Sequence, residues 1–120
     1  MSDNGVQFDA KIVLSSGKIK ADADSLARSL QAPLDAMILH DCNYFVPIKT
    51  GALQKSAIIY TRLGSGEIIW RTPYARRLYY EYRKPAHQAN PNACAKWAEA
   101  AKSRWYDKWV RFLNERIQRS

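Results

Sequence analysis

The sequence predicts an α+β fold in which a small antiparallel sheet packs against two long helices. Three observations lead to this prediction: an alternating N-terminal segment, two β-branched segments near the middle, and two long stretches with apolar residues every three or four positions. The sheet is expected to contain the N-terminal strand and a central hairpin. The 120 residues show no repeat and no linker-like composition, so we expect one domain over residues 1–120.

The first half is expected to form a strand and then a helix. In residues 6–14, VQFDAKIVL, every second residue is apolar, which is typical of a strand with one buried face. Residues 22–43 have helical spacing, with Asp22 or Asp24 as the expected cap. Pro33 is expected to kink this helix or to mark the meeting of two helices. The residues expected to face the core are Leu26, Leu30, Leu34, Met37 and Ile38.

The segment VPIKTGALQKS, residues 46–56, predicts a sharp turn from the helix into the sheet. Proline holds the preceding residue extended, so the helix should end before Val46. Thr50 is expected to cap the turn with its hydroxyl, and Gly51 to adopt a conformation that a Cβ resists. Leu53 should then point inward, while Lys55 and Ser56 stay outside.

The second half is expected to supply the hairpin and the last helix. Residues 57–61 and 67–70 are rich in β-branched and aromatic residues and flank Gly64-Ser65-Gly66, which predicts a hairpin. Residues 74–84 fit either a short helix or an irregular segment, followed by a loop. The last helix is expected to begin with Asn90 as cap and Pro91 at its first position. Its apolar stripe comprises Cys94, Trp97, Ala98, Ala101, Trp105, Trp109, Phe112 and Leu113.

Composition excludes several classes of protein. No apolar run is long enough for a membrane span, and the N-terminus lacks the features of a signal peptide. Two cysteines are too few for a disulfide scaffold, so we expect folding in a reducing cytoplasm. The first sixty residues carry six basic and six acidic residues, whereas the last sixty carry thirteen and five, which is the whole net charge of +8. This asymmetry indicates either a surface for phosphate or an acidic partner, or a solvated helix face.

No pattern in the chain predicts catalysis, a cofactor or a metal. The histidines and cysteines are His40, Cys42, His87 and Cys94, and their spacings differ from those of structural zinc sites. No close pair of carboxylates, phosphate-binding loop or nucleophile motif is present. We therefore expect a protein that is not an enzyme.

Residues 70–84, WRTPYARRLYYEYRK, mix aromatic and basic side chains. Three interpretations remain open, namely a protein interface, packing within the chain, and stacking on nucleic-acid bases. The candidate residues for a subunit or partner interface are Trp70, Tyr74, Tyr79, Tyr80 and Tyr82. The candidate residues for contact with DNA are Arg76, Arg77, Arg83 and Lys84.

Three segments together resemble a known family. VPIKTGALQKS resembles the VP-x-x-TG-x-L-x-x-S signature of small neck and minor capsid proteins of tailed bacteriophages. PYARRLYY at residues 73–80 and NPNA at 90–93, followed by Trp97 and Ala101-Lys102, are similar to two further segments of that family, in the same order. The turn residues that match its signature are Val46, Pro47, Thr50, Gly51, Leu53 and Ser56.

The resemblance implies a structural protein of the virion at the head–tail junction, made in the host cytoplasm. Such proteins form rings of identical copies around the DNA exit channel and join the portal or connector to the tail. Non-specific contact with packaged DNA would suit the basic residues, and no membrane is involved. The alternative, based on charge and on residues 70–84, is a small nucleic-acid-binding module or an RNA-cleaving toxin-like protein.

Overall fold

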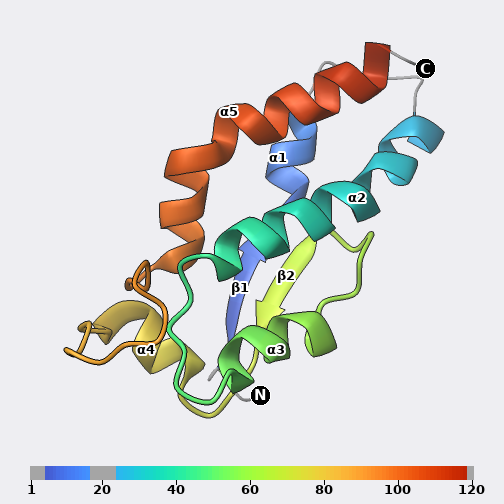
Figure 1. Cartoon of the computed structure of the whole chain (residues 1–120). Coiled ribbons are helices and arrows are strands. Elements are labelled where there is room, and N and C mark those ends of the chain that lie inside the picture. The colour runs from blue at the N-terminus through green and yellow to red at the C-terminus, as the bar shows by residue number, and fades with distance from the viewer. Residues whose placement is uncertain (1–4, 17–23, 119–120) are drawn as a thin grey trace.

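The computed structural model describes residues 5–16 and 24–118 (Figure 1). It confirms the α+β class. The elements in chain order are β1 (Val6–Asp9), α1 (Lys11–Ser15), α2 (Asp24–Asn43), α3 (Ala52–Tyr60), β2 (Glu67–Trp70), α4 (Ala75–Glu81) and α5 (Trp97–Gln118). None of the described helices is long and apolar enough to cross a membrane.

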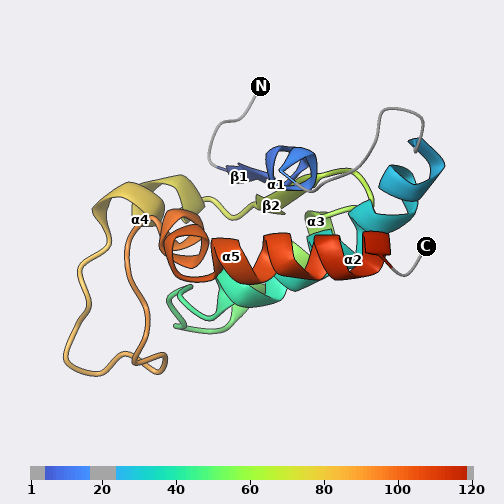
Figure 2. The same ribbon diagram turned by 90° about the horizontal axis from the view of Figure 1, so that it is seen from above.

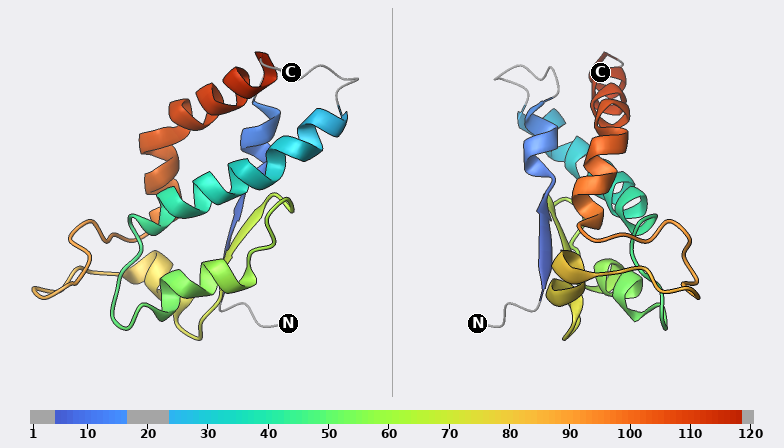
Figure 3. Two further views of the ribbon diagram at one scale, coloured as in Figure 1. Left: turned by 45° about the vertical axis from the view of Figure 1, so that its right-hand side comes forward. Right: turned by 90° about the vertical axis from the view of Figure 1, so that its left-hand side faces the viewer.

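The molecule is flat and elongated, with extents of 49 × 31 × 19 Å. The two long helices, α2 and α5, lie against each other, and both contact the short helix α1. Seen from above, β1 and α1 lie at one side of the molecule and α2 and α5 at the other (Figure 2). The strand β2 lies between β1 and α3, which places these two elements on opposite sides of it (Figure 3).

The sheet differs from the predicted hairpin. Within the described part of the chain it has two strands, β1 and β2, which run antiparallel. Val6 pairs with Trp70 and Phe8 with Ile68, so their side chains share the face that meets the core. The N-terminal strand is thus the partner of β2, and residues 57–61 add no strand to the sheet.

Residues 57–61 belong mainly to α3, so the prediction of a strand there is wrong. Gly51, with φ of 86°, starts the helix, and the side chains of Leu53 and Ala57 bury its inner face. Strand propensities differ by at most about 1 kcal/mol between residues, so burying this face outweighs the preference of Ile58 and Ile59 for a strand.

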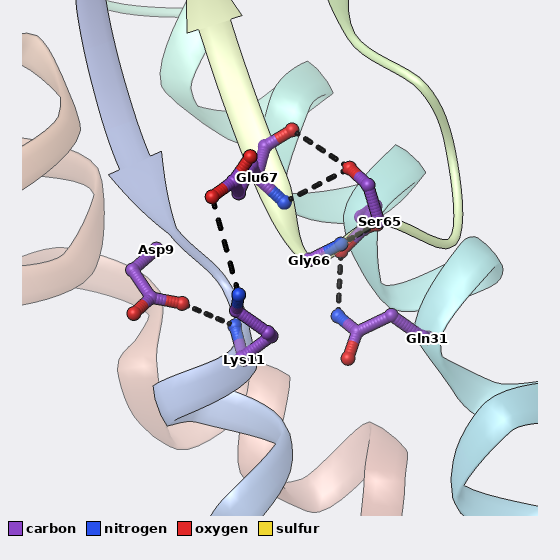
Figure 4. A network of polar contacts seen from close by, with 7 residues as sticks. Asp9, Lys11, Gln31, Ser65, Gly66 and Glu67 are labelled. Atoms are coloured by element: carbon purple, nitrogen blue, oxygen red, sulfur yellow. Dashed lines mark hydrogen bonds and ion pairs between the residues drawn. The ribbon is translucent and has the colours of Figure 1, made fainter.

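The first strand is shorter than predicted, since β1 ends at Asp9 and α1 follows. Ala10 N donates to Gly66 O at 2.7 Å, which is the last ladder bond. Asp9 Oδ1 then accepts from Lys11 N at 2.9 Å and turns the chain into a helix (Figure 4). Lys11 Nζ reaches Glu67 Oε2 at 3.9 Å across the same junction. In the described part of the chain no partner strand continues beyond Ala10, so the remaining alternating residues do not extend the sheet.

The helix α2 agrees closely with its prediction. It continues through Pro33 as one element, so the alternative of two helices meeting there is wrong. Leu30, Leu34 and Ile38 are buried, and Leu26 and Met37 pack against the core as partly buried residues. Asp22 and the side chain of Asp24 lie outside the described residues, so their capping stays a prediction.

The last helix begins at Trp97 rather than at Pro91, because other elements occupy the backbone of residues 90–96. Cys94 N donates to Phe45 O at 3.1 Å and Lys96 N to Tyr79 O at 2.7 Å. Lys96 also has a positive φ of 51°, which interrupts a helix. The predicted apolar stripe beyond this point is confirmed. Its buried members are Trp97, Ala98, Ala101, Trp109 and Leu113.

Candidate functional site

The predicted turn at residues 46–56 has the expected cap but leads into a helix. Ala52 N donates to Thr50 Oγ1 at 3.3 Å, and Leu53 is buried as expected. The expectation that Ser56 stays outside is wrong. Ser56 is buried, its Oγ donates to Leu53 O at 2.6 Å, and it accepts from Arg71 N at 3.1 Å. This hydroxyl therefore joins α3 to the edge of β2.

The three motif segments lie together in the fold, although residues 57–89 separate the first from the last. The buried side chain of Asn90 donates from Nδ2 to Tyr44 O at 2.9 Å and to Val46 O at 2.8 Å. Ile48 N donates to Gln88 Oε1 at 2.7 Å, and Gln88 Nε2 donates to the hydroxyl of Tyr82 at 2.9 Å. Asn90 thus satisfies carbonyls just after α2, instead of capping α5 as predicted.

A groove of about 540 Å³ runs between the motif turn, α4 and the loop that follows it. We call it the motif groove. Its lining includes Pro47, Leu53, Tyr74, Leu78 and Tyr82. The motif positions therefore have two structural roles. Some make buried contacts that connect separate segments of the chain, and others line the motif groove.

The predicted interface residues divide into buried and accessible ones. Trp70 is fully buried and donates from Nε1 to Asn43 Oδ1 at 2.9 Å. Tyr79 is also buried, and this burial, together with the charge of Glu99, raises the pKa of its hydroxyl. Neither side chain presents surface to a partner, so local packing accounts for both. Tyr74 and Tyr82 are half-buried, and Tyr80 is 58% exposed.

The predicted DNA-facing residues are all exposed, and two of them line different grooves. Arg76 lines a groove beside β1, whereas Arg83 lines the motif groove. Lys84 Nζ donates to Pro91 O at 2.6 Å, which holds it against the loop. Contact of these four side chains with DNA stays a prediction.

The outer surface of α3 carries an apolar patch that the sequence analysis missed. The patch, called here the α3 patch, consists of Ile58, Ile59, Tyr60 and Leu63, which are 66%, 72%, 47% and 51% exposed. The guanidinium of Arg71 lies over the ring of Tyr60, 5.3 Å from its centroid. The sequence signal was present as consecutive isoleucines, but residues 57–61 were expected to form a strand of the hairpin rather than a helix with an exposed side.

A second concave surface lies on the other side of the sheet and is called here the β1 groove. Its main part, about 500 Å³, lies between β1, α4 and α5, and an adjoining part continues between α1 and α5. Phe8 and Ile12 line both parts, and Ile12 is 55% exposed. Tyr80, the most exposed of the predicted interface residues, lines the main part.

The exposed side of α5 carries basic residues stacked on aromatic rings. Arg104 lies 5.2 Å from the ring centroid of Trp105 and 5.8 Å from that of Tyr44. Lys108 lies 5.2 Å from Trp105 and forms an ion pair with the buried Asp41 at 2.7 Å. The rings restrict where the cations point and leave the guanidinium of Arg104 on the surface.

The histidines and cysteines do not form a reactive or metal-binding cluster within the described ranges. Cys42 is fully buried, and burial, with a smaller contribution from the charge of Asp41, raises the pKa of its thiol. Burial also raises the pKa of Cys94. Both thiols are therefore poor nucleophiles at neutral pH.

Comparison with known families decides the identity. The sequence profile of the family described as minor capsid protein matches residues 9–116. The chain belongs to the minor capsid protein family. The resemblance stated from the three motifs is thereby confirmed at the level of a bacteriophage structural protein of the virion. Neither a curated protein nor a solved structure matches this minor capsid protein.

Proposed function

We propose that this minor capsid protein is a component of the head–tail junction, where identical copies form a ring around the DNA exit channel and join the portal side to the tail. Family membership supports a structural role in the virion. The three ordered motifs support the finer assignment to the neck, because they resemble those of neck proteins. The role requires no catalysis, cofactor or membrane.

The exposed α3 patch is the observation that carries the proposal. Four large apolar side chains, each about half exposed or more, gather on one helix and the loop after it. Soluble monomers rarely leave such side chains together on the surface, and patches of this kind mark contacts between proteins. In a ring, every copy repeats the same contact, so one such patch is covered in every subunit.

The charge of the chain suits a wall beside DNA. Arg104 is exposed, and the neighbouring rings hold it in place. Contacts of this type neutralise phosphates without reading sequence, which suits a channel that passes the whole genome. The proposed partners are therefore further copies of the chain, the portal or connector, the tail, and passing DNA.

The decisive experiment removes the protein from the phage that encodes it. A nonsense codon in its gene should yield DNA-filled heads and separate tails, which electron microscopy distinguishes. Purified protein added to the lysate should restore joined particles and infectivity. Joined particles without the protein, or heads that fail before DNA is packaged, would contradict the proposal.

The ring itself is tested on purified protein. Sedimentation velocity at increasing concentration, with negative-stain microscopy, should show annular particles, either with the chain alone or after the portal protein is added. A chain that stays separate from both the portal and the tail proteins in the same assay would refute a joining role.

A further inference from the structure

We propose that the α3 patch of one copy docks into the β1 groove of the next copy, so that subunits associate head to tail. This inference rests on the proposed ring for the identity of the occupant, a second copy of the chain. It adds the two surfaces and their residues, which neither the family nor the motifs specify.

The two surfaces lie at opposite edges of the sheet. One edge of β2 pairs with β1. At the other edge Ile69 N donates to Thr61 Oγ1 at 2.9 Å, and Arg71 N donates to Ser56 Oγ at 3.1 Å. These bonds fix α3 and the residue after it to that edge, with Ile58 and Ile59 exposed. The β1 groove lies along β1, which forms the opposite side of the sheet. Figure 3 shows β1 and α3 on opposite sides of β2.

This arrangement favours a head-to-tail contact over a symmetric one. A subunit in a ring needs two different surfaces, one for each neighbour, and they must face different ways. The α3 patch is convex because it covers a helix, whereas the β1 groove is concave and has a volume of about 500 Å³. A convex apolar surface fits a groove better than it fits another copy of itself.

The apolar content of the two surfaces also matches. In the groove, Ile12 and Tyr80 are 55% and 58% exposed, and the half-buried ring of Phe8 lies between their elements. Docking would remove these side chains and the α3 patch from water at once. Each large apolar side chain that becomes buried contributes on the order of 1 kcal/mol or more, which is the usual basis of a stable contact.

Charge supports the same pairing. Arg71 lies over the ring of Tyr60 in the α3 patch, and Lys55 and Arg62, both exposed, stand next to the patch in the chain. The two parts of the β1 groove carry three exposed carboxylates, those of Asp9, Glu99 and Asp107, together with Arg76 and Lys102. In a chain with a net charge of +8, a surface with more acidic than basic residues is unusual. The patch should therefore be attracted to the groove and repelled by another patch.

The test uses one exposed substitution in each surface, Ile59→Arg in the patch and Ile12→Arg in the groove. Both should fold, since both side chains are more than half exposed. Ala36→Arg on the exposed side of α2, outside both surfaces, is the matched control. Circular dichroism checks folding, and Ile58→Glu with Tyr80→Glu forms a second pair if either arginine variant fails to fold.

Sedimentation velocity then measures self-association of the wild type, of each variant, and of an equimolar mixture of Ile12→Arg and Ile59→Arg. We expect the wild type and Ala36→Arg to self-associate, and each interface variant to require at least a tenfold higher concentration. The mixture should form pairs and nothing larger, because only the patch of Ile12→Arg and the groove of Ile59→Arg remain intact.

Three results would overturn the docking contact: a wild type that remains monomeric at every concentration, an Ile12→Arg variant that assembles normally, or a mixture that stays monomeric. These results are distinct from failure of the proposed function. Rings that form despite both substitutions would refute the docking contact but not the proposed role in the neck. Heads and tails that join without the protein would refute the role in the neck, whatever the sedimentation experiment shows.

Discussion

Removing the carboxylate of Asp35 should destabilise the fold strongly. Asp35 lies fully buried on α2, and its Oδ2 accepts from Gly64 N and from Gly66 N, both at 2.9 Å. Its Oδ1 accepts from Gln31 Nε2 at 2.7 Å. The two glycines have positive φ angles and form the loop that leads into β2. The side chain thus fixes the start of β2 to the long helix.

The expected cost of Asp35→Ala follows from the donors left without a partner. Each buried N–H without an acceptor costs about 1–3 kcal/mol. Gly64 is exposed, so water can replace its acceptor, whereas Gly66 is buried. Taking about 1 kcal/mol for Gly64, about 2 for Gly66 and about 1 for the buried Gln31 Nε2, we expect a loss of about 4 kcal/mol in the free energy of unfolding. For a chain of this length that lowers the Tm by about 16 °C.

Urea and thermal unfolding, followed by fluorescence of the buried tryptophans, measure this loss. Asp35→Asn keeps an acceptor oxygen for the glycines and should lose less than half as much. Asp107→Ala removes an exposed carboxylate and should change the free energy of unfolding by less than about 0.5 kcal/mol. If Asp35→Ala were no less stable than Asp107→Ala, the idea that this carboxylate holds the loop would be wrong.

Three further predictions concern the motif turn, Asn90 and the buried thiol. Gly51→Ala should cost about 1 kcal/mol in urea unfolding because of its φ of 86°, and Gly51→Asn should cost less; equal stability of both with wild type would contradict this reading. Asn90→Ala frees two carbonyls and should cost about 2 kcal/mol, whereas Asn92→Ala, at an exposed position, should be neutral in the same assay. Burial raises the pKa of the Cys42 thiol above its ordinary value of 9.0, so the thiol stays protonated in the folded chain when the unfolded chain already loses the proton. The contribution of this thiol to the free energy of unfolding is therefore fully present below pH 9 and is lost as the pH rises above 9. Between pH 9 and pH 10.5 the wild type should therefore lose about 1–2 kcal/mol more than Cys42→Ala; parallel pH profiles would refute it.

Much of the architecture follows from periodicity in the sequence. The recurrence of Leu30, Leu34 and Ile38 predicted α2, and the stripe through Trp97, Ala101 and Trp109 predicted the direction that α5 faces. Both patterns succeed because a long helix must bury one face, so its apolar spacing reports its structure directly. Short segments carry less of this information. Residues 57–61 have strand propensity, yet all but Thr61 belong to a helix that buries Leu53, Ser56 and Ala57 on one side.

The motifs alone indicated the family and the positions of Thr50, Gly51 and Leu53, because these depend on local backbone geometry. Only the tertiary structure decided that β1 pairs with β2, that Asn90 binds the carbonyls after α2, and that Trp70 and Tyr79 are buried. It also decided that Ile58 and Ile59 lie at the surface, opposite a groove formed by four separate elements. The physical reason is that exposure and pairing depend on residues far apart in the chain, which no local pattern records.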